Sequence, residues 1–137
     1  MSAERFFLDT AYVQALLNIR DQYHQTAGTL YPRVRAAREV WVTEAVLTEV
    51  GNALAASLRT EVVQFIECSY TTPNIQVVPV DTALFRRALH LYRERADKIW
   101  GLTDCISFVV MQDRELIDAL TADEHFRQAG FRPLLCE

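Results

Sequence analysis

Four carboxylates of the chain stand where they could act together on a metal ion. They come from four separate segments: Asp9 ends "RFFLD", Glu49 lies in the stretch after "VWV", Asp104 opens an apolar run, and Asp123 follows "DALTA". Carboxylate oxygens suit Mg²⁺ or Mn²⁺, whereas a zinc site would usually recruit His or Cys. Two such ions could clamp the attacking and leaving oxygens of a phosphodiester.

Each acid also has a purely structural interpretation when it is taken singly. Asp9, Asp104 and Asp123 could cap a helix or add favourable charge to its first turn. Glu49 could pair with an arginine. This interpretation weakens for the set, because four carboxylates in one low-dielectric cleft repel one another, and a bound divalent cation would relieve the repulsion. The metal-site hypothesis therefore depends on whether the fold brings the four segments together.

Short apolar strands alternate with longer helices, and this order predicts such a meeting point. Strands are predicted at residues 5–9, 40–42, 75–80, 116–121 and 131–135, and helices at 11–38, 43–58 (with Thr43 as N-cap), 61–70, 81–95 and 103–113. Strands separated by helices, without an Asn-Gly hairpin signal, are typical of right-handed βαβ units and a parallel sheet. The predicted class is α/β. Ligands of such sheets bind beyond the carboxyl ends of the strands, where we expect the acids to lie.

Length and composition bound the type of protein. The chain of 137 residues has the size of one domain, expected to span residues 1–137. The opening "MSAERFFLDT" resembles neither a signal peptide nor a membrane span, which predicts a cytoplasmic protein. Cys68, Cys105 and Cys136 are widely spaced and lack a C-x-x-C pattern, so we expect reduced thiols.

The charge pattern leaves nucleic-acid binding open. A formal net charge of −4 argues mildly against it, because nucleic-acid-binding surfaces are normally basic. The basic residues gather in two stretches, however: Arg33, Arg35 and Arg38, and then Arg86, Arg87, Arg93, Arg95 and Lys98. These stretches are either binding surfaces or two solvated helix faces.

Four segments in this order and spacing resemble the PIN domain family, particularly the compact bacterial versions typified by VapC toxins: "FFLDT", "VLTEVGNAL", "LTDCISFVVM" and "ALTADEHFRQAGFRPLL". The resemblance covers essentially the whole chain. It implies a three-layer α/β/α sandwich with a five-stranded parallel sheet, and Mg²⁺- or Mn²⁺-dependent cleavage of RNA. It also implies that Asp9, Glu49, Asp104 and Asp123 are the metal-binding acidic quartet, with Asp97 as an additional acid.

The resemblance also implies protein partners. VapC toxins are restrained by a small antitoxin protein, which would lay a helix or strand beside the acids and offer them an arginine. Relatives usually form homodimers. Residues 60–70 and 85–95 combine aromatic and aliphatic side chains that could form such an interface or could simply pack in the core.

Residues beside the acids have expected supporting roles. Thr10 could hydrogen-bond in the same pocket, and Thr121 offers a hydroxyl that could orient a carboxylate or a phosphate. Glu124 is expected to cap the helix that follows Asp123. His125 is interpreted as a surface histidine, because a metal-activated water needs no histidine as general acid.

Other phosphoryl-transfer families fit the sequence less well. A haloacid dehalogenase-type phosphatase needs a second Asp two residues after the first, where this chain has Ala11. A response-regulator receiver needs a lysine on its last strand, and the single lysine, Lys98, lies in a predicted loop. The remaining alternative is a free-standing PIN-fold protein that binds RNA or a partner with little or no nuclease turnover. The complete quartet favours the nuclease.

Overall fold

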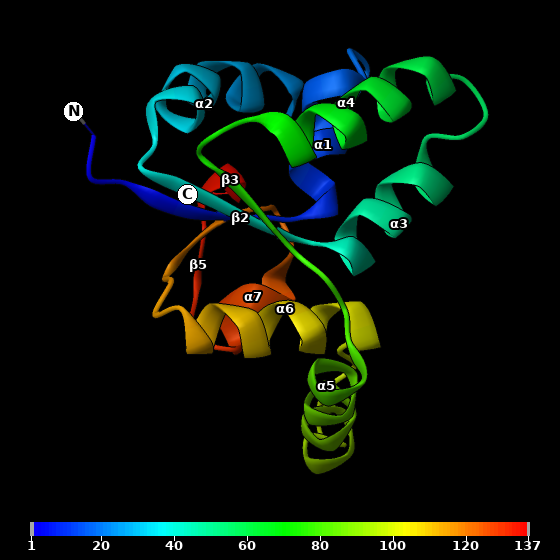
Figure 1. Ribbon diagram of the computed structural model, residues 1–137, viewed down its shortest axis with the longest axis vertical. Helices are drawn as coiled ribbons and strands as arrows, with labels where there is room; N and C mark the ends of the chain where they lie inside the picture. The colour runs from blue at the N-terminus through cyan, green and yellow to red at the C-terminus, as the bar shows by residue number, and fades with distance from the viewer. Residues whose placement is uncertain (1, 137) are drawn as a thin grey trace.

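A sheet of five parallel strands forms the centre of the computed structural model, which describes residues 2–136. The strands are β1 Arg5–Leu8, β2 Glu39–Thr43, β3 Ile75–Val78, β4 Asp118–Leu120 and β5 Arg132–Pro133, in the spatial order β3-β2-β1-β4-β5. Helices cover both faces of this sheet (Figure 1). The predicted three-layer α/β/α sandwich with a five-stranded parallel sheet is therefore confirmed.

Seven α-helices connect the strands. Their bounds are α1 Thr10–Leu17, α2 His24–Ala36, α3 Glu44–Ala53, α4 Arg59–Thr71, α5 Thr82–Glu94, α6 Leu102–Asp113 and α7 Glu124–Gln128, and a 3₁₀ turn, η1, follows at Leu134–Cys136. Helices α1, α2 and α4 lie on one side of the sheet, and α6 and α7 lie on the other, with α5 packed outside α6 (Figure 1). Thr43 caps α3 as predicted, since its hydroxyl accepts a hydrogen bond from the Val46 N–H at 3.1 Å.

Strand β1 lies in the middle of the sheet and brings distant parts of the chain together. Its residues Phe6, Phe7 and Leu8 are buried, as expected for a strand that is covered on both faces. It pairs with β2 on one side and with β4 on the other, and Leu8 lies opposite Leu120. The carboxyl ends of β1 and β4 are therefore neighbours, although more than 100 residues separate them in sequence.

Several predicted bounds were too long. The stretch 11–38 is two helices, because Asn18 and Asp21 form turns between them: the Asn18 side chain accepts from the Arg20 N–H at 3.0 Å and the Asp21 side chain from the Tyr23 N–H at 2.8 Å. Helix α3 ends at Ala53 rather than at residue 58. The last three strands are shorter than predicted, and residues 134 and 135, predicted as strand, belong to η1.

An aromatic cluster joins α6 to α7. The Phe108 ring packs edge-on against Trp100 and against Phe126, each with ring centroids 5.0 Å apart, and lies 5.6 Å from Phe131. All residues of α6 from Cys105 to Met111 are buried, which agrees with the apolar run that follows Asp104 in the sequence. The cluster fixes the start of α7 beside the start of α6.

Two expectations about the whole chain can be compared with the structure. The thiols of Cys68, Cys105 and Cys136 are free, as expected for reduced cysteines. Within residues 2–136, no helix combines the length and the apolar character that a membrane span requires.

Candidate active site

The four predicted acids line one pocket beyond the carboxyl ends of β1 and β4. Asp9 follows β1, Glu49 projects from α3, Asp104 lies in the first turn of α6, and Asp123 follows β4 and caps α7. The pocket has a volume of about 570 Å³, and its lining is Asp9, Thr10, Ala11, Gln14, Glu49, Asn52, Ala53, Asp104, Asp123 and His125. We call it the acidic pocket. The expected convergence is observed, while the catalytic role of the four acids remains a prediction.

Asp9 is the most deeply buried of the four acids. Only 6% of the residue is exposed, and its backbone N–H continues the sheet by donating to the Leu120 carbonyl at 3.3 Å. The pKa of the Asp9 carboxyl is raised to about 7, mainly by burial and to a smaller extent by the nearby charges of Asp104 and Glu49. The hydrogen bond from Thr121 opposes this rise. Asp9 is therefore a carboxylate whose negative charge is costly without a nearby cation.

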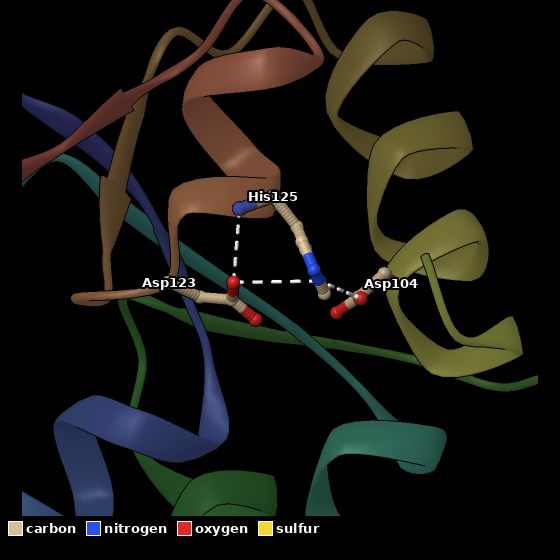
Figure 2. A group of neighbouring side chains, drawn as sticks. All are labelled: Asp104, Asp123 and His125. Carbon is tan, nitrogen blue, oxygen red and sulfur yellow. Dashed lines mark hydrogen bonds and ion pairs between the residues drawn. The ribbon is translucent and has the colours of Figure 1, made fainter. Parts of the chain in front are cut away.

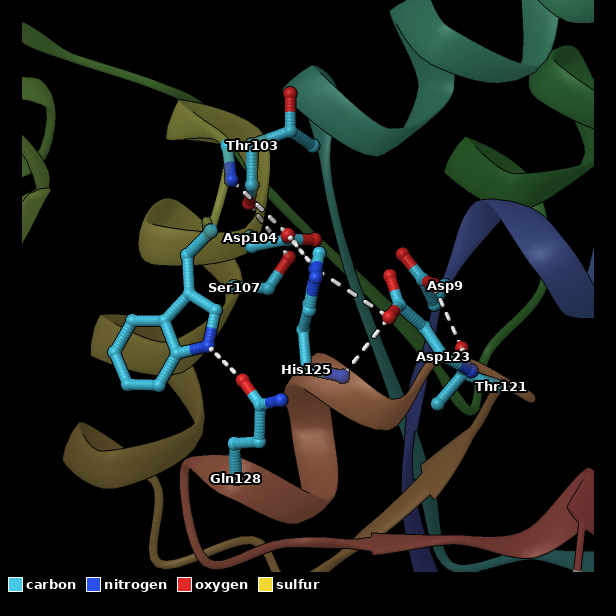
Figure 3. Close-up of polar contacts among 10 residues, drawn as sticks. Asp9, Thr103, Asp104, Ser107, Thr121, Asp123, His125 and Gln128 are labelled. Atoms are coloured by element: carbon cyan, nitrogen blue, oxygen red, sulfur yellow. Dashed lines mark hydrogen bonds and ion pairs between the residues drawn. The ribbon is translucent and has the colours of Figure 1, made fainter. Parts of the chain in front are cut away.

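Thr121 connects Asp9 to Asp123 (Figure 3). Its hydroxyl donates to Asp9 Oδ2 at 2.8 Å and accepts from the Asp123 N–H at 3.0 Å, and the residue is fully buried. The predicted hydroxyl contact with a carboxylate is thus present.

Replacing Thr121 by valine is expected to destabilise the metal-free protein by about 1–3 kcal/mol at pH 8, because the buried Asp9 carboxylate loses its hydroxyl donor. The loss should be smaller at pH 5, where Asp9 is mostly neutral given its pKa of about 7. Urea unfolding at both pH values measures the effect. Thr48→Val is the control, since the Thr48 hydroxyl is exposed and donates to the Glu44 carbonyl within its own helix. Equal losses for the two variants would contradict the role given to Thr121.

Thr10 forms a hydrogen bond with Glu49, the pocket acid that lies on α3. The Thr10 hydroxyl donates to Glu49 Oε1 at 2.7 Å, and Thr10 itself is buried at the start of α1. The sequence-based expectation that Thr10 hydrogen-bonds in this pocket is confirmed. The contact ties α3 to the end of β1 and orients the Glu49 carboxylate.

His125 lies among the acids, which the sequence interpretation as a surface histidine did not anticipate. Its Nδ1 is 2.9 Å from Asp104 Oδ2 and 3.4 Å from Asp123 Oδ1 (Figure 2). The backbone N–H of His125 donates to Asp123 Oδ1 at 2.9 Å, so Asp123 rather than Glu124 caps α7. This cap turns the chain and brings the imidazole back toward Asp123. The position of Asp123, an N-cap candidate two residues before His125, could have indicated this arrangement in the sequence.

Asp104 is held at the opposite wall of the pocket. Its Oδ2 accepts a hydrogen bond from the Gly101 N–H at 3.2 Å, and burial raises the pKa of its carboxyl while the contact with His125 opposes the rise. Gln14 and Asn52 also line the pocket and were missed in the sequence. Asn52 lies three residues after Glu49 on the same helix, so helical spacing could have identified it.

Asp97 does not line the acidic pocket. Its carboxylate receives two hydrogen bonds from Arg95, at 3.0 and 3.1 Å, and lies 3.9 Å from Lys98 Nζ. The side chain is 60% exposed. The additional acid that the resemblance implied is therefore placed in a surface ion pair, away from the other acids.

The chain was compared with protein-family models over its whole length. The model of the PIN domain matches residues 6–132. The chain belongs to the PIN domain family. A similar solved structure is that of Mycobacterium tuberculosis VapC20, described as a toxin that cleaves the sarcin-ricin loop. It is 24% identical, with a TM-score of 0.82, over 93% of this chain and 96% of that chain. At this identity the likeness shows the fold. Comparison with curated protein sequences found no significant match.

The residues of this PIN domain fit a divalent cation. No arginine or lysine of residues 2–136 lines the acidic pocket, so its four carboxylates have no permanent cationic partner there. Donor atoms of Asp104, Asp123 and His125 lie within 4.8 Å of one another. Hard divalent ions prefer carboxylate oxygens. The raised pKa of the Asp9 carboxyl means that its ionised form is unfavourable as it stands, and a bound cation would stabilise it.

Proposed function

We propose that this PIN domain is a Mg²⁺- or Mn²⁺-dependent endoribonuclease that hydrolyses RNA phosphodiester bonds. The observation that carries the proposal is the convergence of Asp9, Glu49, Asp104 and Asp123 in one pocket, which no arginine or lysine among residues 2–136 lines. The fold shared with VapC20, a toxin that cleaves RNA in the sarcin-ricin loop, supports RNA as the substrate. Membership of the PIN family supports the same choice.

Each acid has a separate task in this proposal. Asp9, Glu49, Asp104 and Asp123 hold the metal, Thr121 orients the Asp9 carboxylate, and Thr10 orients that of Glu49. A divalent ion bound there would lower the pKa of a water molecule and stabilise charge on the phosphate oxygens. The negative pocket would repel the RNA backbone without a bound cation, so metal binding and substrate binding are expected to be coupled.

The proposal predicts RNA cleavage that depends on added metal. The purified protein should cleave RNA in millimolar Mg²⁺ or Mn²⁺ and lose all cleavage in excess EDTA, with activity restored when metal is added back. Gel analysis of a labelled RNA that contains both hairpins and single strands measures this. Intact RNA under every metal condition would favour the alternative of a binding protein with little or no turnover, and cleavage that survives EDTA would point to a contaminating nuclease.

We further propose that the chain is the toxin of a toxin–antitoxin pair and acts in the cytoplasm. The acidic pocket is open to solvent and would accept an arginine from an antitoxin as a charge-complementary plug. Induction of the chain alone should arrest bacterial growth. Unchanged growth, with active protein present in the cells, would indicate a nuclease outside such a pair.

A second copy of the chain is the other proposed partner. Helix α5 exposes Phe85, Leu89 and Tyr92, whose exposed fractions are 42, 46 and 46%. Their spacing of four and three residues puts them on one face, while Leu84 and Ala88 point inward. An apolar stripe of this kind suits a homodimer contact. Light scattering at micromolar concentration should give twice the chain mass of 15.7 kDa, and a monomer mass would contradict the dimer.

A further inference from the structure

The imidazole of His125 lies between two acids of the acidic pocket. Nδ1 is 2.9 Å from Asp104 Oδ2 and 3.4 Å from Asp123 Oδ1, and the side chain is 23% exposed (Figure 2). The three side chains come from two elements, with Asp104 on α6 and both Asp123 and His125 at the start of α7. The roles proposed above leave this histidine without a function.

The packing of α7 holds the imidazole in place independently of its contacts with the acids. Trp100 Nε1 donates to Gln128 Oε1 at 2.9 Å, which ties the last turn of α7 to the loop before α6 (Figure 3). The Phe126 ring packs edge-on against Phe108 in the core. Because Phe126 and Gln128 anchor the part of α7 that follows His125, its ring faces Asp104 without a large loss of conformational entropy on binding a ligand.

The spacing of the three donor atoms suits one cation. Two neighbouring ligand atoms of an octahedral ion, each at about 2.1 Å from it, lie about 3 Å apart. The separations of 2.9 and 3.4 Å from Nδ1 to the two carboxylate oxygens are close to this value. A hydrogen bond between Nδ1 and Asp104 would give a similar distance, so the two possibilities must be separated by experiment.

We propose that His125 is a nitrogen ligand of the divalent ion that Asp104 and Asp123 hold, and that this makes the site prefer Mn²⁺ to Mg²⁺. The inference rests on the proposed function. Imidazole suits transition-metal ions, whereas Mg²⁺ is bound through oxygen and dehydrates reluctantly. A mixed set of one nitrogen and several carboxylate oxygens therefore favours Mn²⁺ over Mg²⁺ more strongly than an all-oxygen set, which suits both ions.

Pulsed electron paramagnetic resonance of the Mn²⁺-loaded full chain tests the proposal without measuring activity. A directly bound imidazole should give a ¹⁴N modulation of the Mn²⁺ spin echo, and the modulation should change when the protein is grown with ¹⁵N-labelled histidine. It should disappear in His125→Ala and persist in His90→Ala, because His90 is an exposed residue of α5 outside the acidic pocket. The spectra of the unmodified chain decide the question even if His125→Ala fails to fold.

Calorimetric titration gives the second readout. In His125→Ala the Mn²⁺ dissociation constant is expected to rise on the order of 10-fold or more, since groups that only support metal ligands typically contribute about 10–100-fold. The dissociation constant for Mg²⁺ should change much less, so the ratio of the Mg²⁺ constant to the Mn²⁺ constant should fall.

Two outcomes would overturn the inference in different ways. Mn²⁺ binding that is lost in Asp104→Asn but shows no nitrogen coupling would remove His125 as a ligand and leave the proposed nuclease site intact. Absence of Mn²⁺ binding by the unmodified chain would overturn both the inference and the proposed function. An equal loss of Mn²⁺ and Mg²⁺ affinity in His125→Ala would contradict the metal preference.

Discussion

Replacing Asp9 by asparagine is expected to lower RNA cleavage on the order of 100-fold or more, because the loss of a direct metal ligand should exceed the 10–100-fold cost that is typical for residues that only support ligands. Asp9 is the buried centre of the site, joined to β4 through Thr121 and close to the charges of Asp104 and Glu49. Asparagine keeps the shape and removes the charge. Single-turnover cleavage of a labelled RNA in saturating Mn²⁺ measures the effect.

The matched control is Asp113→Asn. Asp113 is an exposed aspartate of α6 whose carboxylate pairs with Arg87, and it lies outside the acidic pocket. It should retain full cleavage. If Asp9→Asn cleaves RNA as well as the parent, the activity belongs to another site or to a contaminant, and the acidic pocket loses its assigned role.

The same substitution is expected to stabilise the metal-free protein at pH 8. The pKa of the Asp9 carboxyl is raised from 3.8 to about 7 in the folded state, which corresponds to a penalty of roughly 2–4 kcal/mol for the ionised form. Asparagine carries no charge and avoids the penalty. The free energy of unfolding of Asp9→Asn in EDTA should therefore exceed that of the parent by an amount in this range.

The pH dependence of the difference follows from the direction of the shift. Between about pH 4 and pH 7 the folded parent binds more protons than the unfolded chain, so the parent loses stability as the pH rises through this window. Below pH 4 the carboxyl is neutral in both states and the two proteins should be equally stable. Urea unfolding at pH 4, 6 and 8 measures the difference, and titrating groups that do not interact with Asp9 cancel because both proteins contain them.

If the parent is as stable as Asp9→Asn at pH 8 in EDTA, the ionised Asp9 carboxylate does not destabilise the folded protein, and this part of the account is wrong. Addition of Mn²⁺ at 1,000 times its dissociation constant should cancel or reverse the expected difference in stability, since an ion that binds only the folded parent then adds about 4.1 kcal/mol. Asp9→Asn should gain far less from Mn²⁺. The buried Asp9 carboxylate would thus lower the stability of the metal-free protein and at the same time provide a ligand for the metal ion.

Much of the frame of the site could be predicted from the sequence because burial and function leave separate patterns. The apolar run of Phe6, Phe7 and Leu8 predicted a buried strand, and Thr43 marked the start of α3. Parallel strands place their carboxyl ends at one edge, where the acids were expected. The strand order was not predicted, and the structure shows that Asp9 and Asp123 lie near each other because β1 and β4 are neighbours.

Side-chain placements that depend on local turns were harder to predict. His125 lies in the pocket because Asp123 caps α7 and turns the chain at this point. Helical periodicity in the sequence does not predict this backbone geometry. Asp97 was expected near the other acids but lies at the surface. Arg95, two positions earlier, donates a hydrogen bond to its carboxylate there. The apolar spacing of residues 11–38 predicts one helix, whereas the side chains of Asn18 and Asp21 form turns that separate α1 from α2.

Anomalous diffraction from crystals soaked in Mn²⁺ tests the central claim most directly. We expect at least one anomalous peak in the acidic pocket, within ligand distance of the carboxylates of Asp9, Asp104 or Asp123, and no such peak in crystals of Asp9→Asn soaked identically. Crystals of the parent that show Mn²⁺ only outside the pocket, with the pocket open to solvent, would contradict the proposal that these carboxylates gather to hold a divalent ion.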